Sequence, residues 1–365
     1  MKFLLSSELV QEAMAKIDRV LKAKSSIPIL SGVLFEAKEN CILLTASDGT
    51  ESIIHRIPVE DGAAIIEKEG TSVFSKDCLD VVKKLKGLIT FEAEGHVLKI
   101  TQEKTNLEFS TLDPSEYPKI AIEQSSQPIT FSGKEFGEIV GKTAFAVATS
   151  EVRPILQGVN MTFSENGNVF SSTDSHRLAQ VKSGSFHGDI NITVPAKTLV
   201  NTVKSFDLSS DVILFPSDVN VAFANRNTIF YSRLLEGAYP DTSRLIPREY
   251  DSNLVLNKKE FQESLELLML MTKNDVVKLK VDGLFVEIIA IEDLSKGSRQ
   301  LAFESYDGDE NFVISFSAKF VSEALKTMES TSITIGFNGN LRPFVIRPVE
   351  EDLSELQLVL PVRMV

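Results

Sequence analysis

Apolar and polar residues alternate along this chain in two ways, which together predict a protein of mixed helices and strands. In residues 8–21, apolar side chains recur every three or four positions, as they do on one face of an amphipathic helix. Short stretches such as 33–37 and 51–58 instead alternate apolar and polar residues, which is typical of strands. Asp48 and Gly49, between two such stretches, predict a hairpin turn. We therefore expect an α+β protein of short strands separated by helices.

The pattern predicts the same order of elements three times: a strand and a helix, several strands, a second helix, and several more strands. The pair Tyr117-Pro118 returns as Tyr239-Pro240, 122 residues later (239 − 117). We expect three domains of this kind: 1–124, 125–249 and 250–365. Three unrelated α+β domains that agree by chance are the alternative, which the matching helix positions, spacing and Tyr-Pro pair disfavour.

The second predicted helix of each repeat carries two lysines seven positions apart. Seven positions are about two helical turns, so both lysines lie on one face of their helix. The six residues are Lys76 and Lys83, Lys197 and Lys204, and Lys319 and Lys326. Lysine suits phosphate contacts better than base reading, so the repeated face favours a duplex nucleic-acid backbone bound without sequence preference. Plain surface lysines are the alternative that spacing alone leaves open.

Composition narrows this picture. The chain has 365 residues, 43% hydrophobic and 24% charged, as expected for two or three folded domains. A net charge of −13 argues against nucleic-acid binding over the whole surface, although not against cations concentrated on one face. With only Cys41 and Cys78, and with no membrane-length apolar run or signal peptide, we expect a reduced, cytoplasmic protein.

Enzymatic chemistry has little support in the sequence. The string Asp174-Ser175-His176 contains the residue types of a hydrolytic triad, but adjacent residues point in different directions and do not converge. Phosphate-binding and nucleophile-elbow motifs are absent, and the four histidines lack metal-ligand spacing. We therefore expect no catalysis, no metal and no cofactor. The alternative from another functional class is a repeated-domain hydrolase or nucleotide-binding enzyme.

Motifs from the first residue to the last make the chain resemble a known family. The most specific are TDSHRLA (173–179), YPDTSRLIP (239–247) and LPVR (360–363). The others are MKF (1–3), IPILSG (27–32), LTASDGTE (44–51), STLDPSEYP (110–118), VRPILQGV (152–159) and LRPFVI (341–346). Together they resemble the bacterial sliding clamp, the β subunit of the replicative DNA polymerase holoenzyme.

This resemblance implies three repeated domains of the DNA-clamp fold, with two chains joined head to tail in a closed ring. Helices would line the central hole and sheets would lie outside. The implied function is a non-catalytic processivity factor that encircles duplex DNA and slides without sequence specificity. It would tether the replicative DNA polymerase, the clamp loader and other clamp-motif proteins in the nucleoid. A clamp paralogue whose ring closes poorly, or which serves a specialised partner, fits the same resemblance.

The resemblance also assigns residues to DNA binding and dimerisation. It places Lys24, Lys76, Ser150, Arg153 and Lys197 at or near DNA, and the other repeated lysines on the same inner wall. Ala196 departs from relatives that are basic there, so we expect a weaker contribution from the second repeat. The implied dimer interface joins Leu107 and Phe109 to Leu270 and Met271, for which an ordinary core role is the alternative.

A third implied site is an apolar pocket between the second and third repeats that accepts a short partner peptide. Its aliphatic walls would accept leucine or phenylalanine, while Thr173, Arg177 and Arg363 would hold polar peptide groups. The tail differs from relatives that have methionine around the proline. Without the resemblance, the tail would read simply as a last core strand. The implied pocket residues are Leu156, Thr173, His176, Arg177, Leu178, Pro240, Arg244, Leu245, Leu341, Pro343, Leu358, Val359, Leu360, Pro361, Val362, Arg363 and Met364.

Overall fold

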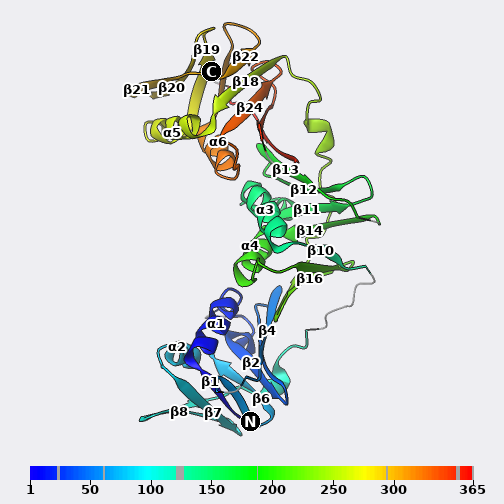
Figure 1. Cartoon of the computed structure of the whole chain (residues 1–365), viewed down its shortest axis with the longest axis vertical. Helices are drawn as coiled ribbons and strands as arrows, with labels where there is room; N and C mark the ends of the chain where they lie inside the picture. The colour runs from blue at the N-terminus through cyan, green and yellow to red at the C-terminus, as the bar shows by residue number, and fades with distance from the viewer. Residues whose placement is uncertain are drawn as a thin grey trace. The chain divides into compact units, whose positions relative to one another are not determined.

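The computed structural model describes residues 1–22, 25–60, 62–120, 127–186, 188–292, 295–350 and 354–363 (Figure 1). The chain forms two compact units, each made of two separate stretches. The first unit comprises Met1–Gly137 and Thr198–Leu234, and the second comprises Glu138–Lys197 and Leu235–Val365. In the part of the chain described, none of the helices has both the length and the apolar character needed to cross a membrane.

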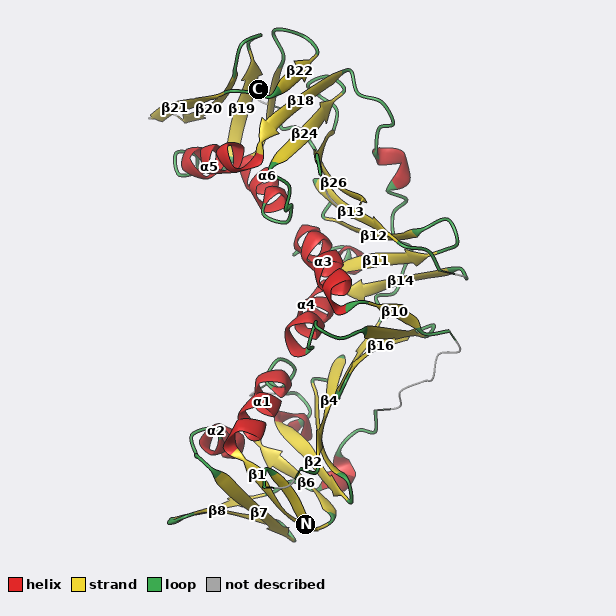
Figure 2. Ribbon diagram, viewed as in Figure 1, coloured by secondary structure: helices red, strands yellow, loops and turns green. Residues whose placement is uncertain are grey.

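One motif of a strand, a helix and three strands occurs six times along the described chain (Figure 2). The six helices are α1 (Ser7–Ile17), α2 (Lys76–Val82), α3 (Gly133–Thr143), α4 (Ala196–Ser205), α5 (Lys258–Met269) and α6 (Ala318–Leu325). The strands before them are β1 (Lys2–Ser6), β6 (Gly70–Ser75), β10 (Ile129–Phe131), β14 (Ile190–Pro195), β18 (Ser252–Asn257) and β23 (Val313–Ser317). This order confirms the α+β repeat predicted from the sequence.

The first unit contains two antiparallel sheets. One has the strand order β5-β1-β7-β8-β9, and the other has the order β10-β15-β16-β17-β4-β3-β2-β6. The added strands are β2 (Gly32–Lys38), β3 (Cys41–Ser47), β4 (Glu51–Pro58), β5 (Ala64–Lys68), β7 (Leu88–Glu94), β8 (Val97–Gln102), β9 (Thr105–Ser110), β15 (Val212–Pro216), β16 (Asn220–Asn225) and β17 (Thr228–Arg233). Pairing of β4 with β17 joins strands of the first and second sequence repeats, and we call it the first junction.

The second unit is built in the same way. Its sheets have the orders β14-β11-β12-β13-β26-β25-β24-β18-β22 and β21-β20-β19-β23. The added strands are β11 (Gly158–Phe163), β12 (Asn168–Thr173), β13 (Arg177–Ser183), β19 (Val276–Val281), β20 (Val286–Glu292), β21 (Ser295–Leu301), β22 (Ser305–Asp307), β24 (Ser332–Phe337), β25 (Phe344–Pro348) and β26 (Ser354–Val359). Pairing of β13 with β26 joins the second and third repeats, and we call it the second junction.

Equivalent turns set the start of the joining strands β4 and β13. The Oδ1 atom of Asp48 accepts the backbone N–H groups of Thr50 and Glu51, at 2.9 and 3.0 Å. The Oδ1 atom of Asp174 accepts the corresponding groups two and three residues later, at 2.9 and 3.0 Å. Gly49 takes a φ of 91°, a left-handed conformation that suits glycine, as predicted for a hairpin turn. The two turns therefore provide a common reference for comparing the junctions.

Polar residues directly before the helices cap them, but the first helix ends earlier than its apolar pattern predicts. The hydroxyls of Ser6 and Ser75 accept the N–H groups three residues later, as N-caps do. Helix α1 ends at Ile17, whereas the apolar pattern predicts a helix through residue 21. Val20 and Leu21 are only 1% and 4% exposed, so the chain continues to fill the core after it has left the helix. Apolar spacing therefore overestimates the helix length.

Candidate functional site

The repeated lysines lie on α2, α4 and α6, opposite a buried face. Val82 and Leu325 are 1% and 0% exposed, whereas the matching Val203 is only half-buried. The first lysine of each pair lies in the first turn of its helix, and the second lies in the last turn or at the C-cap. A cation at the C-terminal end of a helix interacts favourably with the helix dipole. Ala196 is 5% exposed and therefore belongs to the buried face.

The six lysines have different surroundings. Lys197, Lys204 and Lys319 are exposed, as is Lys326, whose Nζ lies 3.1 Å from Glu266. Lys76 and Lys83 are half-buried. The Nζ atom of Lys83 lies 2.5 Å from Asp18 and 2.7 Å from Asp80. Burial acts to lower the pKa of Lys83, but the two carboxylates raise it by more than burial lowers it. The pKa therefore lies above its usual value, and Lys83 stays protonated.

Two of the other residues expected near DNA lie in one loop. Ser150 and Arg153 are both exposed, between two short 3₁₀ helices at Ala144–Ala146 and Pro154–Gln157. The Ser150 hydroxyl accepts the N–H of Val152, which is 87% exposed. Lys24 lies outside the described residues. This loop thus displays a cation beside an exposed apolar side chain.

The expected partner pocket is built around the second junction. Leu178 of β13 pairs with Leu358 of β26, and both pack against Val345 in a buried cluster. Leu156 is also buried, and Thr173 ends the neighbouring strand β12. Pro240, Arg244 and Leu245 lie in the exposed segment that follows the first unit, and its Ile246 packs on the same cluster. The structure therefore brings the strand residues of the predicted site together.

The chain after β26 continues along this region in a fixed path. The N–H of Leu360 donates to the carbonyl of His176 at 2.9 Å, and that of Val362 donates to the carbonyl of Ser315 at 2.7 Å. Leu341, Val362 and Arg363 line a cavity of about 370 Å³ with Asn340 and residues of β23. Pro343 and Pro361 are half-buried, and Met364 lies outside the described residues.

Arg177 is the most constrained side chain of this region. Its Nε donates to Asp174 at 3.0 Å, one terminal nitrogen donates to the carbonyl of Phe145 at 2.9 Å, and the other pairs with Glu323. Its guanidinium lies over the rings of Phe145 and Phe320, 5.2 and 4.6 Å from their centroids. Sequence reasoning missed Phe145, Phe320 and Glu323. Glu323 lies four residues after Lys319, on the same helix, but nothing in the local sequence links either residue to Arg177.

The Asp174-Ser175-His176 string forms a turn in the structure. Asp174 accepts backbone N–H groups and binds Arg177, while Ser175 has a left-handed φ of 77°. The Thr173 hydroxyl donates to the carbonyl of Arg177 at 2.5 Å. Within the described residues, no group of three or more histidine, cysteine or acidic side chains could hold a metal ion. The string therefore serves to shape the hairpin.

The predicted interface residues lie near two unpaired strand edges. In the described chain, β9 and β21 end their sheets, whereas the corresponding strands β4, β13, β17 and β26 form the two junctions. Leu107 and Phe109 lie on β9 and are half-buried. Leu270 follows α5 and is 85% exposed, and the half-buried Met271 carbonyl accepts the Ser295 hydroxyl of β21. Leu270 is therefore not a core residue, whereas Met271 also packs against a buried hydrophobic cluster.

Comparison with known proteins covers the whole chain. Family models for the N-terminal, central and C-terminal domains of the DNA polymerase III beta subunit match residues 1–121, 130–241 and 243–363. The beta sliding clamp of Bacillus subtilis is 32% identical over 380 residues, covering 100% of both chains. That of Staphylococcus epidermidis is 33% identical over 359 residues, covering 94% of both.

Solved structures agree. The crystal structure of the DNA polymerase sliding clamp from Bacillus subtilis has a TM-score of 0.95 at 31% identity, with full coverage of both chains. The beta chain of DNA polymerase III from Streptococcus pneumoniae has a TM-score of 0.95 at 30% identity, also with full coverage. The chain therefore belongs to the beta subunit family of bacterial DNA polymerase III, the beta sliding clamps.

Proposed function

We propose that this chain is a homodimeric processivity factor that encircles duplex DNA and tethers the replicative DNA polymerase and other clamp-motif proteins. Its domains would be 1–124, 125–249 and 250–365. Its place would be the cytoplasm, at the nucleoid, where a clamp loader opens it onto DNA. The expectation that it is not an enzyme is confirmed by its relatives, which are named sliding clamps.

The observation that carries this proposal is the rule by which the repeats join. At each junction, the last strand of one repeat's first motif pairs with the last strand of the next repeat's second motif. Applied once more, the rule pairs β21 with β9 of a second copy. A two-fold axis repeats that pairing, so two chains use up both pairs of edges and close a ring. The half-buried Leu107, Phe109 and Met271 and the exposed Leu270 support this interface.

The lysine helices support the proposal that the ring encircles DNA. In a dimer, α2, α4 and α6 of both chains would present twelve lysines (2 × 3 × 2) to the enclosed duplex. Enclosure prevents dissociation, so each lysine needs only to attract the backbone weakly, which allows sliding. The tethered polymerase then meets the primer end at a high effective concentration. Lys83 and Lys326 already bind carboxylates, so each is expected to attract the backbone less than the exposed Lys319 does.

Partner proteins would bind the pocket at the second junction through a short apolar peptide. The cavity beside Leu341 and Val362 accepts an apolar anchor, and the exposed Arg363 suits a polar or acidic peptide group. Thr173 and Arg177 already bond within the chain, so their contribution would be to hold the wall in place. Deleting residues 361–365 is expected to abolish binding of a clamp-motif peptide in a fluorescence titration and to leave the dimer intact.

Retention on circular DNA tests the proposed function. Wild-type protein loaded on a nicked circle should stay bound through gel filtration and be lost when the circle is cut. Changing Lys76, Lys197 and Lys319 together to glutamate should impair loading and retention without lowering the melting temperature. A charge-matched variant with glutamate at the exposed strand residues Lys38, Lys99 and Lys182 should behave like wild type. Equal retention by both variants would refute the role of the helices.

A further inference from the structure

The two junctions can be compared position by position, because equivalent turns begin β4 and β13. His55 is the fifth residue of β4, and Val181 is the fifth residue of β13. Across the ladder, His55 pairs with Thr228 and Val181 pairs with Glu355. Thr228 in the first junction therefore occupies the position of Glu355 in the second.

At the second junction this position holds a buried ion pair. The Nζ atom of Lys142, from α3, lies 2.9 Å from Oε2 of Glu355, and the two side chains are 7% and 0% exposed. The Oε1 atom of Glu355 accepts the Gln357 amide at 3.0 Å and the Thr327 hydroxyl at 3.1 Å. A carboxylate thus satisfies the lysine that the helix delivers to this junction.

At the first junction the lysine is present, but its carboxylate partner across the sheet is not. Lys16 of α1 corresponds to Lys142, since each lies ten residues after the N-cap hydroxyl of its helix (16 − 6 and 142 − 132). Opposite Lys16 the strand supplies Thr228, and Lys16 instead binds Glu12 on its own helix at 2.9 Å. Glu12 is 61% exposed, and exposed pairs of this kind are weak.

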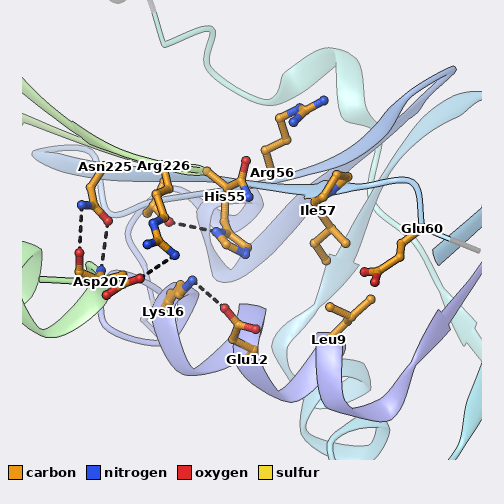
Figure 3. Close-up of a pocket in the computed structure, with 13 residues that line it drawn as sticks. Leu9, Glu12, Lys16, His55, Arg56, Ile57, Glu60, Asp207, Asn225 and Arg226 are labelled. Atoms are coloured by element: carbon orange, nitrogen blue, oxygen red, sulfur yellow. Dashed lines mark hydrogen bonds and ion pairs between the residues drawn. The ribbon is translucent and has the colours of Figure 1, made fainter. Parts of the chain in front are cut away.

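A cavity of about 230 Å³ lies at this place (Figure 3). In Figure 3 the side chains of Lys16, Arg226 and His55 point toward one another around it. Arg226 is held by Asp207 at 2.7 Å, and the Nδ1 atom of His55 lies 2.9 Å from the Thr228 hydroxyl. Burial, with the charge of Lys16 adding to it, lowers the pKa of His55 to about 4, so its ring is neutral at pH 7.

We propose that this cavity binds a small oxyanion, a carboxylate or a phosphate, beside Lys16, where the second junction places the carboxylate of Glu355. Lys16 supplies the charge, and Arg226 together with the polar groups of His55 and Thr228 borders the anion. The cavity lining also includes Glu12 and Asp207, which pair with Lys16 and Arg226, and the charged residues Arg56 and Glu60. An incoming anion must therefore displace the exposed Glu12 from Lys16. The anion is either a free solute or an acidic side chain of a partner protein.

The test uses the full-length protein with isotope-labelled histidine. Acetate and inorganic phosphate are titrated at constant ionic strength against chloride, and the imidazole signals are followed by NMR. A saturable shift of His55 is expected, without a shift of the exposed His96 and His176, which serve as internal controls. A glutamate-containing hexapeptide forms the third titration. Peptide binding at least tenfold tighter than acetate assigns the site to a partner's side chain, and equal binding assigns it to a free anion.

Two variants and one control variant locate the anion. Lys16→Met should abolish the His55 shift, whereas Lys38→Met, at an exposed ion-paired lysine of the same unit, should retain it. Thr228→Glu carries its own carboxylate into the cavity and should also abolish binding while raising the melting temperature. The proposal is overturned if none of the three probes gives a saturable shift, or if the shift survives in Lys16→Met. The Lys16→Met result decides whether the anion binds beside Lys16, even where Thr228→Glu does not fold.

Discussion

The joined strand edges and the open strand edges carry different side chains at equivalent helix positions. Ten residues after the N-cap, α1 and α3 supply Lys16 and Lys142 to the two internal junctions, whereas α5 supplies Leu267 beside the open edge. Leu267 is 50% exposed, and the nearby Leu270 is 85% exposed. Junctions that form within one chain thus use charge and hydrogen bonds, whereas the open edge, at which we propose that a second chain pairs, offers apolar surface.

The difference has a physical reason. A junction inside a chain needs a unique register more than it needs affinity, and a buried polar network that must be satisfied favours one arrangement. An interface between two chains must also offset the entropy lost on association, and apolar burial supplies the larger favourable term. The two internal junctions differ as well, because the pair of Lys142 with Glu355 is buried, whereas the equivalent Lys16 pairs with the largely exposed Glu12.

The largest expected effect is at that ion pair. Glu355→Ala leaves the buried Lys142 without its carboxylate, which should cost about 3–5 kcal/mol of unfolding free energy. Glu12→Ala removes the exposed partner of the equivalent Lys16 and should cost less than about 1 kcal/mol. Urea unfolding of both variants measures the contrast. Similar losses would show that the two junctions do not differ in the way described.

The first junction should weaken in acid through His55. Its folded pKa is about 4, mainly because of burial, and lies below the ordinary value of about 6.5. As the pH falls, the unfolded chain therefore binds the proton first. Stability should decline between about pH 6.5 and 4, by about 3 kcal/mol in total. His55→Val, which copies Val181 of the second junction, should remove this part of the slope in urea unfolding. An unchanged pH dependence would contradict it.

The open edge is tested by a charge in its apolar surface. Leu270→Asp should raise the dimer dissociation constant by about tenfold to a hundredfold, as expected for losing one buried leucine. Leu284→Asp is the matched control, because Leu284 is equally exposed, at 85%, but lies in the turn between β19 and β20. Sedimentation across a dilution series compares them. The assignment of the interface fails if both variants dissociate alike.

The smallest effects separate the repeated lysines. Lys319→Gln should reduce the salt dependence of DNA binding by about one counterion. Lys83→Gln should reduce it less, because its ammonium group already binds Asp18 and Asp80. Binding to a short duplex measured at several salt concentrations gives both slopes. A larger change for Lys83 would reverse the ranking proposed for the inner-wall lysines.

Local features of the fold could be predicted because neighbouring residues create them. Ser6, Ser75 and Asn257 are polar residues directly before an amphipathic pattern, and each caps a helix. Asp48-Gly49 makes a turn from its own atoms. The predicted length of α1 was too long, because tertiary packing also buries Val20 and Leu21, which lie outside the helix.

The site was less accessible to sequence reasoning. Arg177 draws its partners from residues 32 and 146 positions away, which no local pattern connects. The cavity of the first junction becomes visible only once strand pairing shows that Thr228 stands where Glu355 does. The sequence resemblance carried over the pocket residues of β13 and the tail but not Phe320, which lies on a lysine helix.

Strand β1 of the first motif lies in the sheet of β7, β8 and β9, whereas β6 of the second motif lies beside β2. This exchange of first strands has a consequence for synthesis on the ribosome. Strand β1 pairs with β7, so Phe3 lies opposite Phe91 and the two rings stack 4.9 Å apart. The beginning of the chain therefore cannot complete its sheet until almost ninety further residues (91 − 3) have been made. A longer delay occurs in the second unit, where Arg177 pairs with Val359, 182 residues later (359 − 177). Long-range pairings of this kind fold slowly, so we expect these strand edges to stay unpaired during much of synthesis.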